Sequence, residues 1–207
     1  MGALENDRLV WIDCEMTGLD PSRDEIVEIA VVITDFDLTI LDPGLQLVIK
    51  ASDAALGQMN DFVANMHATS GLDREIPHGI ALAEAEQQVL AYIKRFVPQE
   101  RKAPLAGNTI GTDRMFLATH MPELDGYLHY RNVDVSSIKE LARRWMPRVY
   151  FNAPEKNGGH RALADILESI RELQYYRVAA FLPDPGPTSE QAKAISENVV
   201  NSFGSEV

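Results

Sequence analysis

Four carboxylates and one histidine are the residues whose types and spacing could support chemistry in this sequence. Asp13 and Glu15 lie two positions apart at the end of an apolar segment. A strand would project both carboxylates from one face, about 6.5 to 7 Å apart. Two carboxylates at the end of a buried strand are costly unless a cation neutralises them. The alternative is that both lie just past the sheet edge in water, where no cation is needed.

The other three candidates lie near the starts of predicted helices. Asp113 follows the turn GNTIG, and Asp165 falls in the first turn of a later helix. Each can be explained simply by the preference of acidic residues for helix N-termini. His160 precedes Asp165 by five positions and follows two glycines, in a loop where a histidine could meet a substrate water. The alternative is an inert loop histidine, which is the more common case.

Together these five residues fit phosphodiester hydrolysis by two divalent ions. That reaction needs several carboxylate oxygens around ions about 3.5 to 4 Å apart, which activate the attacking water and stabilise the leaving oxygen. A neutral histidine can accept the proton of that water. That the five side chains meet in space is a hypothesis, because the order of residues in a sequence does not test it.

The elements that must position these residues follow from the hydrophobic pattern. Apolar segments with short links predict three strands, which we expect to be antiparallel neighbours. Helices and short strands alternate after them, so we expect an α/β fold with a mixed sheet flanked by helices on both faces. The predicted strands cover 8–15, 26–34, 45–49, 104–106 and 132–135, and the predicted helices cover 89–97, 112–120, 137–145 and 163–173.

Two boundaries are predicted from local signals. Ser137 and Glu140 have the spacing of a capping box, so the helix there is expected to begin at Ser137 and to end before Pro147. From Pro183 onward the sequence is polar and rich in turn residues. We therefore expect one domain over 1–182 and a flexible C-terminal tail over 183–207, on which catalysis does not depend.

Composition and charge limit the class of partner. The chain of 207 residues is 45% hydrophobic, which suits a globular domain with a real core. Lys and Arg number 19 against 31 Asp and Glu, a net charge of −12 that disfavours an extended grip on long nucleic acid. Residues 129–161 reverse this balance with seven basic and three acidic side chains, which suits either a small anionic ligand or a solvated basic face.

Other classes of protein are excluded by what the sequence lacks. Cys14 is the single cysteine, so neither an internal disulfide nor a multi-cysteine zinc site is possible. The apolar runs are too short to span a bilayer, and the first residues do not resemble a secretory signal. We expect a cytoplasmic protein without a membrane partner.

Four segments resemble the oligoribonucleases, which are DEDDh 3′-to-5′ exonucleases with an RNase H-like fold: WIDCEMTGLD, GNTIGTDRMFL, HYRNVDVSSIKELARRW and GGHRALADI. The resemblance covers most of residues 8–178, and its EMTGL and HYR-to-ELARRW segments are specific to that family. It implies an RNase H-like mixed sheet, a homodimer, and two Mg²⁺ or Mn²⁺ ions in each active site. It also implies cleavage of very short single-stranded oligoribonucleotides, especially dinucleotides, to nucleoside 5′-monophosphates.

The resemblance assigns roles by matching positions. The general base would be His160, and the metal ligands would be Asp13, Glu15, Asp113 and Asp165. Tyr130 would enter the catalytic site from the partner subunit. Six positions would contact substrate: Leu19, Phe62, His67, Thr109, Arg131 and Ser136. Among these, Leu19 would wedge against a base and Phe62 would stack on one, while the last three would hold the 5′ phosphate.

The sequence departs from the family pattern at three places, and it leaves two alternative functions to consider. Thr109 replaces the usual serine, Ala164 occupies a position that is often a second aspartate, and the tail after Pro183 lies outside the common core. None of these removes a catalytic group. The alternatives are an exonuclease of the same group that acts on longer single strands, which would need an open basic path, and a non-catalytic nucleotide binder. The acidic composition disfavours the first, and the complete catalytic set disfavours the second.

Overall fold

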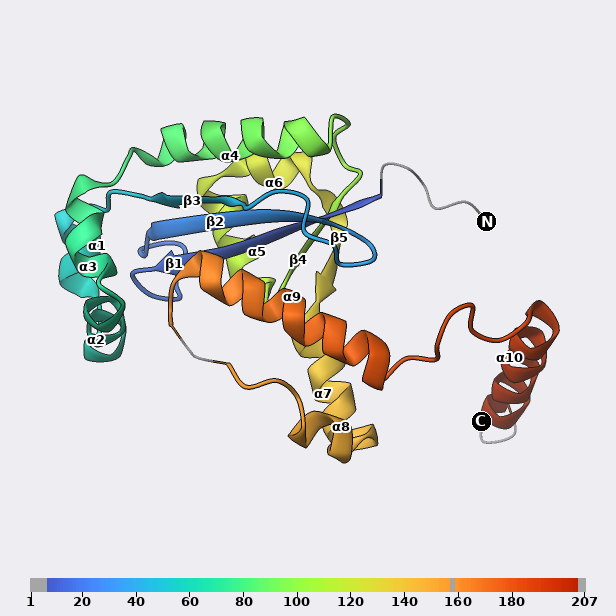
Figure 1. Ribbon diagram of the computed structural model, residues 1–207. Coiled ribbons are helices and arrows are strands. Elements are labelled where there is room, and N and C mark those ends of the chain that lie inside the picture. The colour runs from blue at the N-terminus through green and yellow to red at the C-terminus, as the bar shows by residue number, and fades with distance from the viewer. Residues whose placement is uncertain (1–6, 157–158, 205–207) are drawn as a thin grey trace.

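A computed structural model describes residues 7–156 and 159–204 of the chain (Figure 1). In this part of the chain five strands form one mixed sheet in the order β3-β2-β1-β4-β5. The strands are β1 (Arg8–Met16), β2 (Ile26–Asp35), β3 (Leu45–Val48), β4 (Pro104–Gly107) and β5 (His129–Asp134). The first three are antiparallel neighbours, as predicted, while β4 and β5 extend the sheet from β1 in parallel.

The central strands are apolar on both faces because helices cover the sheet from both sides. Val10 and Ile12 of β1 pack into one core with α4, α5 and α6, whereas Leu9 and Trp11 pack into a second core with α7 and α9. The expected helix-flanked mixed sheet is therefore confirmed. The helices of the described part are α1 (Asp53–Gln58), α2 (Asp61–Ser70), α3 (Leu72–Glu75), α4 (Leu82–Phe96), α5 (Gly111–His120), α6 (Pro122–Tyr127), α7 (Val135–Trp145), α8 (Pro147–Phe151), α9 (Ala162–Ala179) and α10 (Ser189–Gly204), with a short 3₁₀ helix η1 (Ile76–His78).

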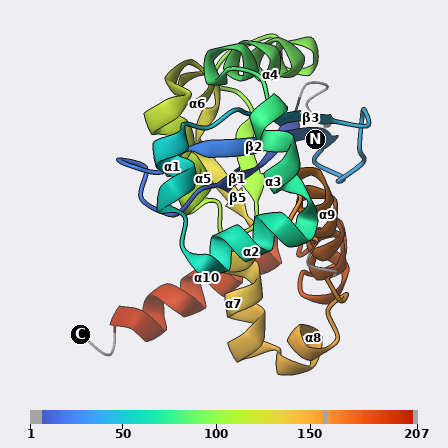
Figure 2. The same cartoon turned by 90° about the vertical axis from the view of Figure 1, so that its left-hand side faces the viewer.

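The short helices α1, α2 and α3 lie together at one end of the sheet (Figure 2). A small third core holds α1 and α3 there, in which Leu72 and Ile76 pack against Val27 of β2. The carboxyl end of β1 and the amino end of α9 lie at this same end of the molecule (Figure 1). Elements distant in sequence thus meet at the end of β1 that carries Asp13 and Glu15.

Helix α7 begins differently from the sequence prediction. Asp134 is its N-cap, and the Asp134 side chain accepts a hydrogen bond from the Ser136 backbone N–H. The expected capping box of Ser137 and Glu140 is therefore wrong: Asp134, at the end of β5, caps the helix three residues before Ser137. The helix ends at Trp145, before Pro147, as predicted.

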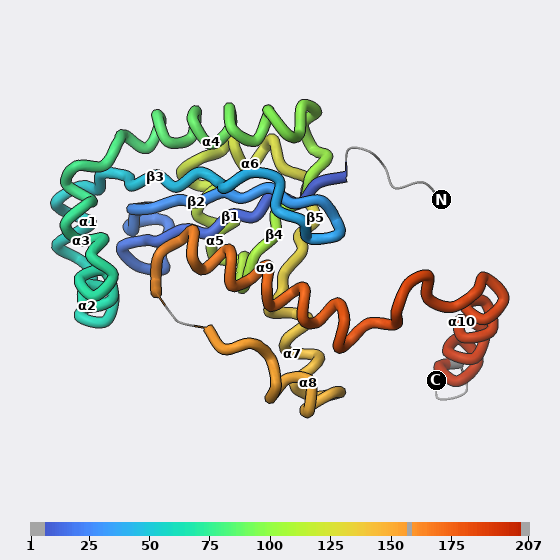
Figure 3. Tube along the Cα trace, in the orientation of Figure 1, coloured from blue at the N-terminus to red at the C-terminus, as the bar shows by residue number. Residues whose placement is uncertain are grey.

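A helix that the sequence analysis does not predict occupies most of the C-terminal segment. The backbone N–H of Thr188 donates to Gln191 Oε1 at 2.9 Å, and the backbone N–H of Gln191 donates back to Thr188 Oγ1 at 3.2 Å. This reciprocal pair is a capping box, which nucleates α10 despite the turn-rich residues before it. The helix stands apart from the sheet and its covering helices (Figure 3). No described helix combines the length and hydropathy needed to span a membrane.

Candidate active site

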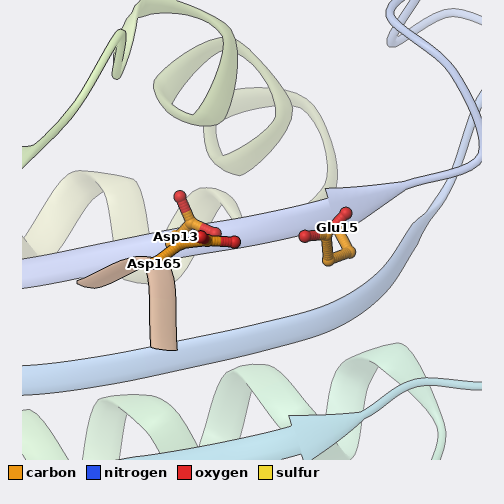
Figure 4. Close-up of side chains that lie close together, drawn as sticks. All are labelled: Asp13, Glu15 and Asp165. Atoms are coloured by element: carbon orange, nitrogen blue, oxygen red, sulfur yellow. The ribbon is translucent and has the colours of Figure 1, made fainter. Parts of the chain in front are cut away.

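Asp13 and Glu15 project from β1 toward α9, on the face that also carries Leu9 and Trp11. Asp165 lies in the first turn of α9, which packs across that face. The three side chains point toward a common centre, and one carboxylate oxygen from each lies within 4.8 Å of the others (Figure 4). A strand and a helix separated by about 150 residues in the sequence thus build one acidic cluster.

Asp113 reaches the same region from the first turn of α5. Its Oδ1 accepts a hydrogen bond from the Cys14 backbone N–H at 3.0 Å. That N–H is available because the pairing of β1 with β4 covers only Val10 and Trp11. Because Cys14 lies between Asp13 and Glu15, this hydrogen bond fixes Asp113 beside both residues. Asp113 is not one of the three carboxylates that lie within 4.8 Å of one another.

Burial and mutual repulsion make these carboxylates hard to ionise. Burial raises the pKa of Glu15 to about 8, with Asp165 contributing next. Burial also raises the pKa of Asp113 to about 6, although the Cys14 amide opposes this rise. The pKa of Asp13 rises well above its usual value, again chiefly through burial and then through Asp113. A hard divalent cation with oxygen ligands would relieve this repulsion, so the donor set fits such an ion.

His160 lies at the entry to α9, one residue before the N-cap Arg161. Its side chain is exposed, and its backbone has the left-handed φ of 46°, which is uncommon for residues other than glycine. Burial raises the pKa of Asp165, and nearby His160 is among the groups that oppose this rise. His160 therefore lies within electrostatic range of Asp165, although it is not among the described residues that line the cavity at the acidic cluster.

The carboxylates line a cavity of about 850 Å³. Its other lining residues include Leu19, Phe62 and Thr109. Leu19 and Phe62 are 75% and 74% exposed, unlike the apolar side chains of the core. Two exposed apolar groups beside an acidic cluster are suited to hold flat, partly apolar ligand groups such as nucleobases.

The turn between β1 and β2 presents Leu19 to the cavity. Asp24 organises this turn, since its carboxylate accepts hydrogen bonds from the Asp20 backbone N–H at 2.9 Å and from Thr17 Oγ1 at 3.4 Å. A Cβ atom on Gly18 would lie 2.3 Å from Asp24 Oδ2, so only glycine fits at this position without displacing Asp24. The turn therefore depends on a close approach of backbone to carboxylate.

Helix α2 presents Phe62 and buries His67. The Asn60 side chain caps this helix by accepting a hydrogen bond from the Val63 backbone N–H at 3.0 Å. Phe62 points outward, whereas His67 is fully buried and its Nε2 donates to the Met16 carbonyl oxygen at 2.9 Å. His67 thus lies behind the cavity wall. Its side chain has no exposed surface with which to contact substrate directly.

Asp134 joins two residues of the expected phosphate cap. Its Oδ1 accepts hydrogen bonds from the Thr109 backbone N–H at 3.0 Å and from Ser136 Oγ at 2.6 Å. The turn after β4 is thereby fastened to the start of α7. Asp134 is not among the site residues predicted from the sequence, although an aspartate directly before a helix is a usual N-cap signal.

Tyr130 and Arg131 project from β5. Tyr130 is 73% exposed, and the Arg131 guanidinium carbon lies 5.3 Å from the centroid of its ring. Among the described residues, neither of them nor Ser136 lines the cavity of their own chain, whereas Thr109 does. The expected cap is therefore only partly assembled within a single chain.

The sheet order and the acidic cluster beside β1 define a nuclease fold of the RNase H-like class, and the sequence matches the RNase_T family, described as exonuclease, over residues 10–173. Within that class, the chain belongs to the oligoribonuclease family. It is 72% identical to the oligoribonuclease of Leifsonia xyli over 201 residues, which cover 97% of each chain. It is 60% identical to that of Streptomyces griseus over 191 residues, 92% of this chain and 95% of the relative. As a member of this family the chain is an enzyme, a 3′-to-5′ exoribonuclease.

Solved structures share the fold. Exonuclease I of E. coli in complex with a dT13 oligonucleotide superposes with a TM-score of 0.66 at 13% sequence identity. The match covers 83% of this chain and 41% of exonuclease I, so the chain spans less than half the length of that protein. The expected RNase H-like architecture is thus confirmed by a structure of low sequence similarity.

Proposed function

We propose that this exoribonuclease hydrolyses very short single-stranded oligoribonucleotides, especially dinucleotides, to nucleoside 5′-monophosphates. The observation that carries the proposal is the acidic cluster in a cavity bordered by Leu19 and Phe62. Two exposed apolar side chains suit two nucleobases, with the connecting phosphodiester over the carboxylates. The net charge of −12 offers no long basic path for a polymer. The dT13 oligonucleotide held by exonuclease I supports a single-stranded substrate for this fold.

Asp13, Glu15, Asp113 and Asp165 would hold two divalent ions, Mg²⁺ or Mn²⁺. Their raised pKa values and oxygen donors suit hard cations of this kind. The ions, when bound, would polarise the scissile phosphate, activate the attacking water and stabilise the leaving oxygen. The carboxylates would also orient the ions against the cavity wall, since Asp113 is itself fixed by the Cys14 amide.

In the proposed reaction His160 accepts a proton from the attacking water while the water oxygen bonds to phosphorus. The bond between phosphorus and the O3′ atom breaks, its electron pair stays on O3′, and that oxygen takes up a proton. The released 3′-terminal nucleoside keeps the phosphate on its 5′ oxygen. The exposed position of His160 beside Asp165 supports this role, because a base that exchanges protons at each turnover must reach solvent.

The 5′ phosphate of the substrate would be held by Thr109, Arg131 and Ser136. An arginine fork and two hydroxyl groups form a suitable shell for a phosphate. Asp134 supports this cap by fastening Thr109 and Ser136.

We further propose a homodimer in which Tyr130 reaches the partner's cavity, because Tyr130 is exposed and does not line its own. His67 would support the cavity wall by its hydrogen bond to Met16. Residues 183–207 would be dispensable for catalysis. The enzyme would act in the cytoplasm.

The metal assignment can be tested on a 5′-phosphorylated diribonucleotide with Mg²⁺ or Mn²⁺. We expect release of nucleoside 5′-monophosphate, loss of turnover in EDTA, and recovery when the metal is restored. Asp113→Asn should lower turnover by more than about 100-fold, since even outer-shell partners of a metal are worth about 10- to 100-fold. Asp53→Asn, in the first turn of α1 and exposed, is the control. Full turnover in EDTA, or a D113N variant equal to D53N, would overturn the assignment.

A further inference from the structure

A buried carboxylate on α9 joins three segments of the chain. The side chain of Glu172 is only 3% exposed and contacts Lys156 Nζ at 2.8 Å and Lys139 Nζ at 3.2 Å. Asn108 Nδ2 donates to the same carboxylate at 2.9 Å. Lys139 belongs to α7, Asn108 to the turn that lines the cavity, and Lys156 to the segment that precedes His160. Glu172 itself lies outside the cavity lining.

The two lysines favour the ionised form of Glu172. Burial alone would raise its pKa, but the hydrogen bonds and charges of Lys156 and Lys139 hold it below the usual value. Breaking one partner of a buried ion pair is costly, because it leaves a charge with too little compensation. The contacts of Glu172 therefore fix the positions of the groups that reach it.

The segment before His160 is fastened to α9 at two consecutive residues. Besides the Lys156 contact, the Glu155 carbonyl oxygen accepts a hydrogen bond from the Arg171 guanidinium at 2.8 Å. Lys156 precedes His160 by four positions, a span of at most about 14 Å of chain. The residue after His160 is held as well, since Arg161 donates to both carboxylate oxygens of Glu75 and to Glu28. His160 thus lies between two anchored points.

We propose that Lys156 is a positioning residue for the reaction: its ion pair with Glu172 anchors the chain four positions before His160. The inference rests on the proposed role of His160 as general base. Lys156 itself touches no reacting atom. Lys139 contacts the same carboxylate from α7, which does not carry His160. It offers a matched comparison, because the two lysine side chains are 36% and 32% exposed.

The test compares Lys156→Met with Lys139→Met in the full-length enzyme, using a 5′-phosphorylated diribonucleotide and saturating Mg²⁺. Methionine keeps the unbranched side chain, one atom shorter, and removes its charge. We expect K156M to lower kcat roughly 10- to 100-fold with KM near the wild-type value, since a small misplacement of a catalytic group costs this much. K139M should keep kcat while lowering the melting temperature about as much as K156M does, and Lys156→Arg should recover most of kcat.

A double variant distinguishes an effect of Lys156 that acts through His160 from one that acts through Asp165. Lys156 also lies close enough to Asp165 to lower its pKa, so an effect through Asp165 would persist without the histidine. In a His160→Ala background we expect K156M to cause no further loss of kcat, because residues that act as a unit are not additive. Equal kcat for K156M and K139M, or an undiminished K156M effect in H160A, would overturn the proposal. Near-normal turnover of H160A alone would instead refute the proposed base.

Discussion

Asp13, Glu15 and Asp165 hold carboxylate oxygens within 4.8 Å of one another in a partly buried place. Arg161 is a cation that lowers the pKa of Glu15, yet that pKa still stands at about 8. Without a metal, the folded protein therefore keeps protons on this cluster that its unfolded chain would release. At the scale of single residues, protons and divalent ions compete for the same oxygens.

This competition predicts how stability depends on pH. A carboxyl whose pKa is raised in the folded state costs stability as pH rises from its ordinary value, 4.5 for Glu15, to about 8. The melting temperature of the metal-free protein should therefore fall across this range. Mg²⁺ should raise the melting temperature more at pH 8 than at pH 6, because it binds the ionised form. Calorimetry with and without EDTA checks this, and an equal metal effect at both pH values would contradict it.

The acidic residues of the site are easier to predict from the sequence than the residues that hold the site in place. The Asp-x-Glu pair on an apolar strand, and acids at helix starts, have local signatures. The burial of His67 depends on a contact between α2 and β1, and the bond from Asp134 to Thr109 joins β5 to the turn after β4. No local pattern contains these two contacts. The family resemblance supplied roles for individual positions, but it did not supply these contacts.

At the scale of elements, the turn between β1 and β2 carries Leu19 to the cavity, while β1 itself carries two of the proposed metal ligands, Asp13 and Glu15. The strand is fixed by its pairing with β2 and β4, whereas the turn depends on Asp24 and on the absence of a side chain at Gly18. In the proposed function, binding of the base and chemistry at the phosphate therefore belong to neighbouring but separate elements.

Gly18→Ala tests this separation. The new Cβ would displace the Asp24 carboxylate, so Leu19 would lose its position while β1 stays in the sheet. We expect KM for a diribonucleotide to rise roughly tenfold, about the worth of one base contact of 1 to 3 kcal/mol, with a smaller change in kcat. Gly57→Ala in α1 is the control, because nothing lies within 4 Å of its added Cβ. Unchanged KM for G18A in steady-state kinetics would refute the role of the turn.

Elements with a strong periodic pattern of apolar residues are predictable from the sequence. Helices whose start depends on a capping residue are harder to predict. The three antiparallel strands and the helix after Gly159 follow directly from apolar spacing. Helix α10 was missed because the prolines at 183–187 dominate its beginning, although Thr188 and Gln191 have the spacing of a capping box. Helix α7 begins earlier than expected because its cap belongs to the end of β5.

At the scale of the whole molecule, one chain holds the acidic cluster but only part of the expected phosphate cap. Tyr130 and Arg131 stack on each other at the surface, away from the cavity lining of their own chain. A second copy that brings Tyr130 to the cavity would complete the site, which is the reason for the proposed homodimer.

Light scattering should give the mass of two chains of 23.0 kDa. If Tyr130 acts in the partner's site, mixing Tyr130→Ala and Asp113→Asn proteins under conditions of subunit exchange should restore activity that neither has alone. Random exchange would make half of the molecules mixed dimers with one complete site each, so we expect about a quarter of wild-type turnover. A monomeric mass, or mixtures as inactive as their components, would contradict the shared site.

The most direct test of the proposed function measures initial rates on 5′-phosphorylated RNA of about two, four, seven and twenty nucleotides under identical Mg²⁺ conditions. A capped cavity predicts the highest kcat/KM for the dinucleotide and a steep fall with length. Arg131→Ala should flatten this length dependence by weakening dinucleotide binding. Rates that hold or rise with length would contradict a closed site and identify an exonuclease of longer strands.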